Sequence, residues 1–168
     1  MPDRKALQRA ARGKREGKSP STQAGEFVRE EIDHIREGKH GARSPQQAIA
    51  IGLSKARRAG IDLKPLSRQK ASARTRRKAE RDYERGHGKA TRGASPRRRA
   101  AVSRALERES RESASPRALA AHARLAANRR SSSQRSAAAR RAARTKGHAA
   151  RSAAARKAAR TRASHRRS

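Results

Sequence analysis

Arginine-rich repeats near the C-terminus contain the side chains of this sequence best suited to chemistry. Residues 136–146 read SAAARRAARTK, and residues 152–162 read SAAARKAARTR. On an α-helix, with about 100° per residue, each copy gathers three cations within roughly 100° of arc and leaves most alanines on the other side. The six cations are Arg140, Arg141, Arg144, Arg156, Lys157 and Arg160. Each repeat therefore predicts a cationic stripe that contacts phosphates.

A second group of cations, Arg97, Arg98 and Arg99, follows Ser95 and Pro96. This Ser-Pro-Arg-Arg element resembles the Ser-Pro-basic-basic element of linker-histone tails, in which a compact turn with two cations lies along an A/T-rich minor groove. A simpler interpretation is an N-cap serine and a first-turn proline that begin a helix, with the arginines in solvent. The sequence favours the simpler interpretation. In either case we expect the three arginines to contact phosphates.

The charge of the chain is large and unevenly placed. The 168 residues include 47 Lys and Arg against 14 Asp and Glu, a formal net charge of +33. Residues 21–65 carry 8 basic and 6 acidic side chains, whereas residues 66–168 carry 32 and 6, with no acid from Ser113 onward. That excess is far more than solubility requires. A polymer with negative charge along a line, DNA or RNA, is the predicted partner.

Other chemistry finds little support. The six histidines are scattered without metal-ligand spacing, although His34 and His40 would flank one turn. With no cysteine, neither a disulfide framework nor a cysteine-based zinc site is available. We find no phosphate-cradling glycine loop and no nucleophile with a base and an orienting acid. The sequence therefore predicts no enzyme, no metal, no cofactor and no small-molecule substrate.

A folded unit is needed to position these cations. Residues 26–65 are the stretch with enough suitably spaced apolar residues to form a core. Val28, Ile32 and Ile35 recur at i, i+4 and i+7, which places them on one face of a helix. Glycines at 38 and 41 then predict a helix stop and a turn. The first helix also has an acidic face, which we expect to pair with Arg29, Arg36 or Lys39, or else to hold the cationic tail or a neighbouring copy: Glu30, Glu31, Asp33 and Glu37.

A second helix is predicted to begin at Ser44 and Pro45, with Ser44 as N-cap and Gln47 closing a capping box back to it. Its apolar stripe is Ile49, Leu53 and Ala56. Gly52 beside the stripe predicts a close approach of the two helices, and Gly60 predicts the end of the second helix. The polar side chains of this helix surround it rather than define one face, which argues against sequence-specific base reading: Gln46, Gln47, Lys55, Arg57 and Arg58.

The predicted architecture is mainly α: a small αα-hairpin at about 21–66, covered by Ile61, Leu63 and Leu66, between long basic arms. Residues 1–20 would form a basic N-terminal arm, with a short helix at 3–15 and a hinge at 17–20. Residues 67–168 would form a basic tail, disordered or conditionally helical, with helices beginning at Ser95-Pro96 and Ser115-Pro116. Such a small core makes a homodimer through the hairpin plausible.

No apolar run approaches the length of a membrane span, and the N-terminus lacks the apolar core of a secretion signal. We therefore expect a protein that does not enter the membrane and that is cytoplasmic and nucleoid-associated.

The hairpin also carries a resemblance. Residues 44–60, SPQQAIAIGLSKARRAG, with the preceding Gly38-Lys39-His40-Gly41, resemble a family of small basic bacterial proteins of uncharacterised function, often labelled plasmid-stabilisation or histone-like. The resemblance covers about forty residues and implies little about mechanism. The two Ala/Arg repeats resemble, in composition, the tails of bacterial proteins similar to linker histone, although this tail uses Arg more than Lys.

The leading hypothesis is non-sequence-specific DNA binding through the Arg-rich tail, with linker-histone-like compaction or bridging of duplex. RNA remains an alternative partner. A hypothesis of a different class makes the hairpin a protein-interaction module in plasmid maintenance, with the tail as an anchor. A third is an RNA-binding or ribosome-assembly factor.

Overall fold

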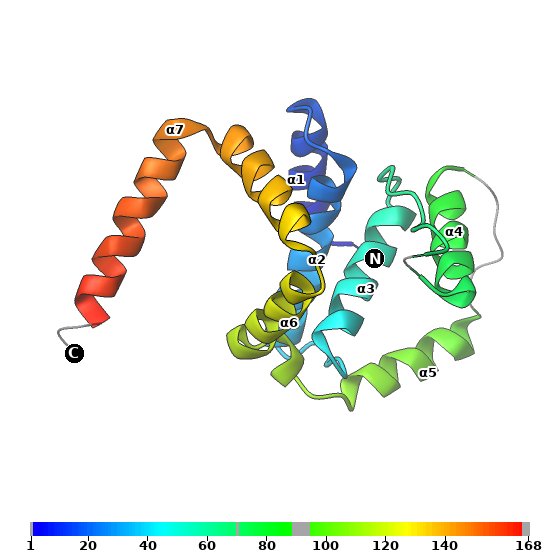
Figure 1. The fold of residues 1–168 in the computed structure, drawn as a ribbon. Coiled ribbons are helices and arrows are strands. Elements are labelled where there is room, and N and C mark those ends of the chain that lie inside the picture. The colour runs from blue at the N-terminus through cyan, green and yellow to red at the C-terminus, as the bar shows by residue number, and fades with distance from the viewer. Residues whose placement is uncertain (1, 70, 89–94, 166–168) are drawn as a thin grey trace. The chain divides into compact units, whose positions relative to one another are not determined.

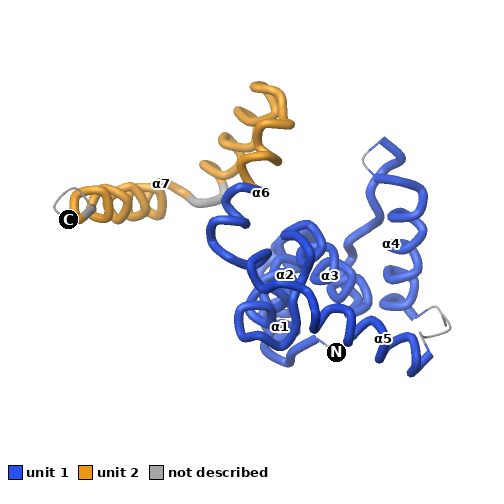
Figure 2. The backbone as a smooth tube through the Cα atoms, turned by 90° about the horizontal axis from the view of Figure 1, so that it is seen from below, with its two compact units in different colours: residues 1–122 blue, residues 123–168 orange. Residues whose placement is uncertain are grey.

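The fold is taken from a computed structural model, which describes residues 2–69, 71–88 and 95–165 (Figure 1). The described residues contain helices and no strand, so the predicted mainly-α class is confirmed. They form two compact units, residues 1–122 and 123–168, which we describe one at a time (Figure 2). The elements in chain order are α1 (Arg4–Arg15), α2 (Pro20–Arg36), α3 (Pro45–Arg58), α4 (Ala73–Gly86), α5 (Pro96–Glu107), the 3₁₀ helix η1 (Glu112–Ala114), α6 (Pro116–Asn128) and α7 (Ser132–His165).

The beginning of α3 follows the predicted Ser-Pro signal. The Ser44 hydroxyl accepts a hydrogen bond from the backbone N–H of Gln47 at 3.3 Å. The Gln47 side chain reaches back to the backbone N–H of Arg43 at 3.0 Å, one residue before the predicted partner. Helix α2 has the same kind of start, with Ser19 as N-cap and Pro20 in the first turn. Of the predicted hinge at 17–20, Gly17 and Lys18 connect α1 to α2, whereas Ser19 and Pro20 begin α2.

Helices α2 and α3 pack at very short distance, and Gly52 makes this possible. A Cβ atom at Gly52 would lie 2.6 Å from the Val28 Cα and 2.9 Å from the Phe27 carbonyl oxygen. The close approach predicted for this glycine is confirmed. Of the two predicted stripes, Ile32, Ile35 and Ala56 are buried, whereas Val28, Ile49 and Leu53 are only partly buried. The buried face of α3 is made instead by Ala48, Gly52 and Ala56.

Helix α1 packs on α2 instead of extending as a free arm (Figure 1). Ala6 and Ala10 are 0% and 2% exposed and join Phe27 in one apolar cluster. Arg9 Nε donates to Glu26 Oε2 at 2.6 Å across the contact. The predicted short helix is present, but the expectation of a detached arm is not confirmed. The physical reason is that small side chains bury little area each yet let two helix backbones come close together.

Helix α4 packs against α3. A Cβ atom at Gly86 would lie 1.9 Å from the Arg57 carbonyl oxygen, so only glycine fits there. Ala79 is buried, and Arg58 Nη1 donates to Asp82 Oδ1 at 3.0 Å. The preceding segment covers the hairpin partly as predicted, because Ile61 and Leu63 pack on the core whereas Leu66 is 53% exposed.

The segment after α5 returns to the turn between α2 and α3. Gly41 N–H donates to the Leu106 carbonyl at 2.8 Å, and Ala42 N–H donates to the Ser110 carbonyl at 3.0 Å. Ala114 in η1 is fully buried with Ile35 in a second apolar cluster. The prediction of a hairpin between disordered arms is therefore not confirmed: residues on both sides of it are helical and pack on it.

The second unit consists of the end of α6 and helix α7. Helix α7 runs from Ser132 to His165 but has non-helical dihedrals at Gly147, φ 66° and ψ 171°. A positive φ is favourable only for glycine, so the chain breaks its helix there and starts another. The start of α6 follows the predicted Ser-Pro signal, because the Ala118 N–H donates to the Ser115 hydroxyl at 3.1 Å. Among the described residues, no helix has the length and apolar character needed to span a bilayer.

Candidate nucleic-acid interface

The six repeat cations all lie on α7, three on each side of the break at Gly147. Each repeat occupies one regular helical stretch, so the helical periodicity gathers its three cations on one side. All six residues are exposed: Arg140, Arg141, Arg144, Arg156, Lys157 and Arg160. No acidic residue occurs on this helix to neutralise them. Each half of α7 therefore presents a cationic stripe to solvent.

The second predicted group lies in the first turn of α5, in the other unit. Ser95 accepts a hydrogen bond from the backbone N–H of Arg98 at 3.3 Å, and Pro96 occupies the first turn. This is the N-cap geometry of the simpler interpretation, which is confirmed. Arg97, Arg98 and Arg99 are exposed. They stand at the positive end of the helix dipole, which also favours anions.

The cationic side chains near the end of α3 have structural partners inside the first unit. Lys55 pairs with buried glutamates, and Arg58 pairs with Asp82. Arg57 is 7% exposed and donates through Nε to the Leu63 carbonyl at 3.0 Å. Burial lowers the pKa of the Arg57 guanidinium, and the Asp82 carboxylate opposes that shift. Lys55, Arg57 and Arg58 are therefore each held by groups of the protein itself.

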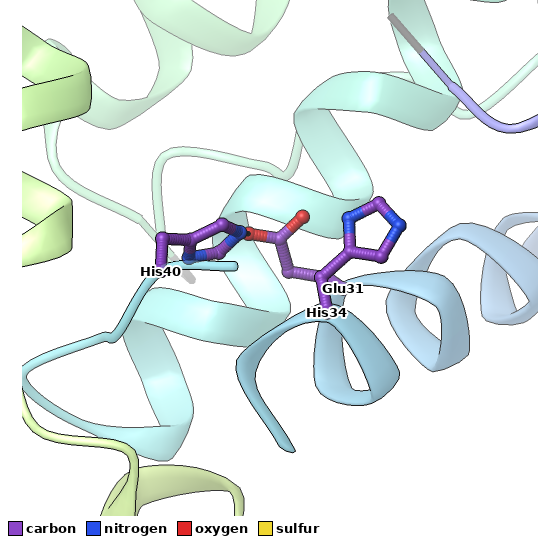
Figure 3. A group of neighbouring side chains, drawn as sticks. All are labelled: Glu31, His34 and His40. Atoms are coloured by element: carbon purple, nitrogen blue, oxygen red, sulfur yellow. Dashed lines mark ion pairs between the residues drawn. The ribbon is translucent and has the colours of Figure 1, made fainter. Parts of the chain in front are cut away.

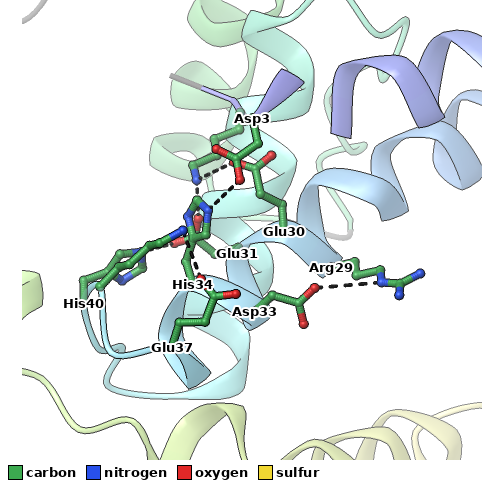
Figure 4. Close-up of polar contacts among 10 residues, drawn as sticks. Asp3, Arg29, Glu30, Glu31, Asp33, His34, Glu37 and His40 are labelled. Carbon is green, nitrogen blue, oxygen red and sulfur yellow. Dashed lines mark hydrogen bonds and ion pairs between the residues drawn. The ribbon is translucent and has the colours of Figure 1, made fainter. Parts of the chain in front are cut away.

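Two buried glutamates of α2, Glu30 and Glu31 (Figure 4), share the ammonium group of Lys55 from α3. Lys55 Nζ lies 3.2 Å from Glu30 Oε1 and 2.7 Å from Glu31 Oε2. Glu30 and Glu31 are 3% and 0% exposed. Taking a charge out of water is costly, so each partner of this group depends on the others.

Two histidines complete this polar cluster beside the turn (Figure 3). His40 Nε2 lies 3.2 Å from Glu31 Oε1, and His34 Nε2 lies 3.0 Å from Asp3 Oδ2. The hydrogen bond with His34 is the main cause that lowers the pKa of the Asp3 carboxyl. The rings of His34 and His40 meet edge to face, with centroids 6.3 Å apart. The two histidines expected to flank the turn are thus brought together.

Spacing alone did not reveal this cluster. Glu31 and His34 are three residues apart on α2, which places them on one face, and His40 returns over the end of that helix. The i, i+3 spacing of Glu31 and His34 is visible in the sequence. The path of the loop that brings His40 back over the end of α2 is not. Two residues of the acidic face form the predicted ion pairs: Asp33 Oδ2 lies 3.9 Å from Arg29 Nε, and Glu37 Oε2 lies 3.0 Å from Lys39 Nζ. Glu30 and Glu31 instead face inward.

Comparison with known proteins gives this chain no relatives. No protein-family model, no curated protein and no solved structure matches it.

Proposed function

We propose that this protein binds nucleic acid without sequence preference, with duplex DNA as the favoured partner, and that it compacts or bridges the duplex as linker histones do. The contacts would be the cationic stripes of α7 and the arginine cluster at the start of α5. Each such contact releases a condensed counterion, which supplies a favourable free energy that does not depend on sequence.

One observation carries the proposal: α7 presents two separate, exposed groups of three cations, with no acid anywhere on the helix. In water, like charges at these spacings oppose the helix, and alanine favours it. Phosphates along one side of each stripe remove the repulsion. We infer that the tail gains helical stability when it is bound, and that the break at Gly147 lets the two halves follow a curved polymer separately.

The geometry of the stripes is tested by a pair of full-length variants with equal loss of charge. One replaces Arg140, Arg141 and Arg144 with Gln. The control replaces Arg74, Arg77 and Arg81 with Gln on α4, where the exposed arginines are interleaved with Glu80 and Glu84. We expect duplex affinity in a fluorescence-anisotropy titration to fall several-fold more in the first variant. Equal losses would mean that total charge alone decides binding.

The nature of the polymer is tested in cell extract. We expect DNase to release the protein from the particulate nucleoid fraction and RNase to leave it there. Release by RNase alone would assign it to RNA, as an RNA-binding or ribosome-assembly factor.

A second candidate is self-association through the hairpin, and a hollow on its surface favours it. A depression of about 760 Å³ between α3 and α4 is lined by apolar groups of Ile49, Leu53 and Leu66 among others. Sedimentation velocity of the full chain, without nucleic acid, should show a dimer that Leu66→Lys dissociates. A monomer at all concentrations would remove this candidate.

A further inference from the structure

The polar cluster of Glu31, His34 and His40 has features that the cationic helices do not explain. Glu31 is fully buried, and neither of its carboxylate oxygens accepts a hydrogen bond of good geometry. Its contacts with Lys55 and His40 are close ion-pair distances only. One ring nitrogen of His34, one ring nitrogen of His40 and one carboxylate oxygen of Glu31 all lie within 4.8 Å of one another. In Figure 3 the carboxylate lies between the two rings.

The partners of His40 fix where its lone pair points. Its Nδ1 lies 3.0 Å from the Gly41 carbonyl oxygen, which can only accept, so Nδ1 carries a proton. In the neutral ring Nε2 then holds a lone pair, and this atom is the one 3.2 Å from Glu31 Oε1. Two lone pairs that face each other at this distance repel unless a proton or a metal ion lies between them.

His34 is arranged in the same way. Its Nε2 donates to the Asp3 carboxylate at 3.0 Å, which leaves Nδ1 with the lone pair. Figure 3 shows one ring nitrogen of His34 on the side that faces the Glu31 carboxylate. Both rings therefore have one nitrogen held by an oxygen acceptor and the other turned toward Glu31. Metal-binding histidines typically have this arrangement, in which the outer partner fixes the tautomer.

The local charge also favours a cation. Three carboxylates lie beside the histidines, those of Asp3, Glu30 and Glu31 (Figure 4). Glu30 and Glu31 share the ammonium group of Lys55, and Asp3 contacts His34. Lys39, which lies nearby, is paired with Glu37 at 3.0 Å. An open hollow of about 460 Å³, lined in part by Asp3, Glu30 and His34, reaches the His34 side of the cluster. A hydrated ion would enter by this route.

We propose that Glu31, His34 and His40 bind one divalent transition-metal ion, of which Zn²⁺ is the best representative. Two imidazoles and one carboxylate form a donor set that zinc and its neighbours accept, and a water molecule would fill the fourth position. Ligands of a tetrahedral zinc ion lie about 3.3 Å apart, so the rings must close in slightly. Both rings are partly exposed and can do so, while Lys55 stays on the other oxygen of Glu31.

The ion would join the C-terminal turn of α2 to the loop that leads into α3. Glu31 and His34 belong to α2, and His40 belongs to the loop. The role expected from this position is stabilisation of the first unit, independent of nucleic-acid binding by the cationic helices.

The test uses the full-length chain without an affinity tag, freed of metal by a chelator. Isothermal titration with Zn²⁺ should give one ion per chain, and Co²⁺ should give the visible absorption of a four-coordinate site. We expect His34→Gln and His40→Gln each to weaken binding by tenfold or more, and Asp3→Asn by about tenfold through the outer partner. Circular dichroism verifies that each variant is folded.

The matched control is His87→Gln, because His87 is exposed and lies in another part of the unit, stacked on Tyr83. This variant should bind Zn²⁺ as the unchanged protein does. The proposal is overturned if the unchanged protein shows no saturable binding up to about 100 µM Zn²⁺. It is equally overturned if the folded His34 and His40 variants bind as tightly as the His87 variant.

Discussion

At the scale of single residues, Lys55 is the side chain on which the interior of the first unit most depends. Its ammonium group lies between Glu30 and Glu31, both of which are almost without contact with water. A half-buried lysine thus stands where the chain buries two acids. Removal of one partner from a buried ion pair leaves the other charge uncompensated, which is the costly case.

Lys55→Met is therefore expected to lower the free energy of unfolding by about 3–5 kcal/mol. Urea unfolding monitored by circular dichroism measures the loss. Lys64→Met is the matched control, because Lys64 is exposed, and its effect should stay within about 0.5 kcal/mol. Equal stability of the two variants would show that Glu30 and Glu31 do not need Lys55.

A second residue-scale prediction concerns pH. Hydrogen bonds from Lys18 and Arg12 lower the pKa of the Glu16 carboxyl from 4.5 to about 2. A depressed folded-state pKa stabilises the folded state above pH 4.5, and this contribution is lost as the pH falls toward 2. NMR titration of the Glu16 carboxyl should give a midpoint well below 4.5. In the Lys18→Ala, Arg12→Ala variant the midpoint should return toward 4.5; a midpoint unchanged by these substitutions would contradict the assignment.

At the scale of elements, the contact of α2 with α3 depends on a missing side chain. Gly52→Ala would place a methyl group 2.6 Å from the Val28 Cα, where backbone atoms cannot move independently. We expect a loss of about 1–3 kcal/mol, the usual cost of overpacking, measured by thermal unfolding.

Gly25→Ala is the matched control for that prediction. Gly25 is also helical, but a Cβ atom there meets nothing within 4 Å. Because alanine favours helix over glycine, this variant should gain up to about 1 kcal/mol. If both variants changed stability in the same direction, the close approach of α2 and α3 would be wrong.

The elements also show what the sequence could predict. Ser44, Ser95 and Ser115 each stand before a proline, and each caps a helix where it was expected. Capping is local, so a few neighbouring residues decide it. Ser19-Pro20 has the same signal, yet the sequence predicts a hinge there. The reason is that the large apolar residues of the following helix begin only at Phe27, although α2 begins at Pro20.

The packing partners of the hairpin were harder to predict for a physical reason. Helix α1 meets α2 through Ala6 and Ala10, which give hardly any hydrophobic signal. The cluster of Glu31 and His40 depends on the course of a loop. In this loop only glycine fits at position 41, because the backbone of residues 106–110 passes directly beside it. Such contacts join residues far apart in the sequence. The six repeat cations needed no such information, because helical periodicity alone places them.

At the scale of the whole molecule, the two units divide the charge between them. The first unit holds every acid of the chain, and most of its acids have a cationic partner within it. The second unit has none. This separation is the basis of the proposed function, because an unneutralised cationic unit stabilises itself by binding phosphates. The proposed metal site lies wholly in the first unit, so its loss should leave nucleic-acid affinity unchanged.

The salt dependence of duplex binding tests the central proposal most directly. If about ten phosphates are neutralised, log K should fall with log salt at a slope near −9. The full chain with Gln at all six repeat positions, 140, 141, 144, 156, 157 and 160, should give a slope shallower by about five, since each lost phosphate contact removes about 0.9. Equal slopes for the two proteins would contradict the account, because the stripes of α7 would then make no contact with phosphate.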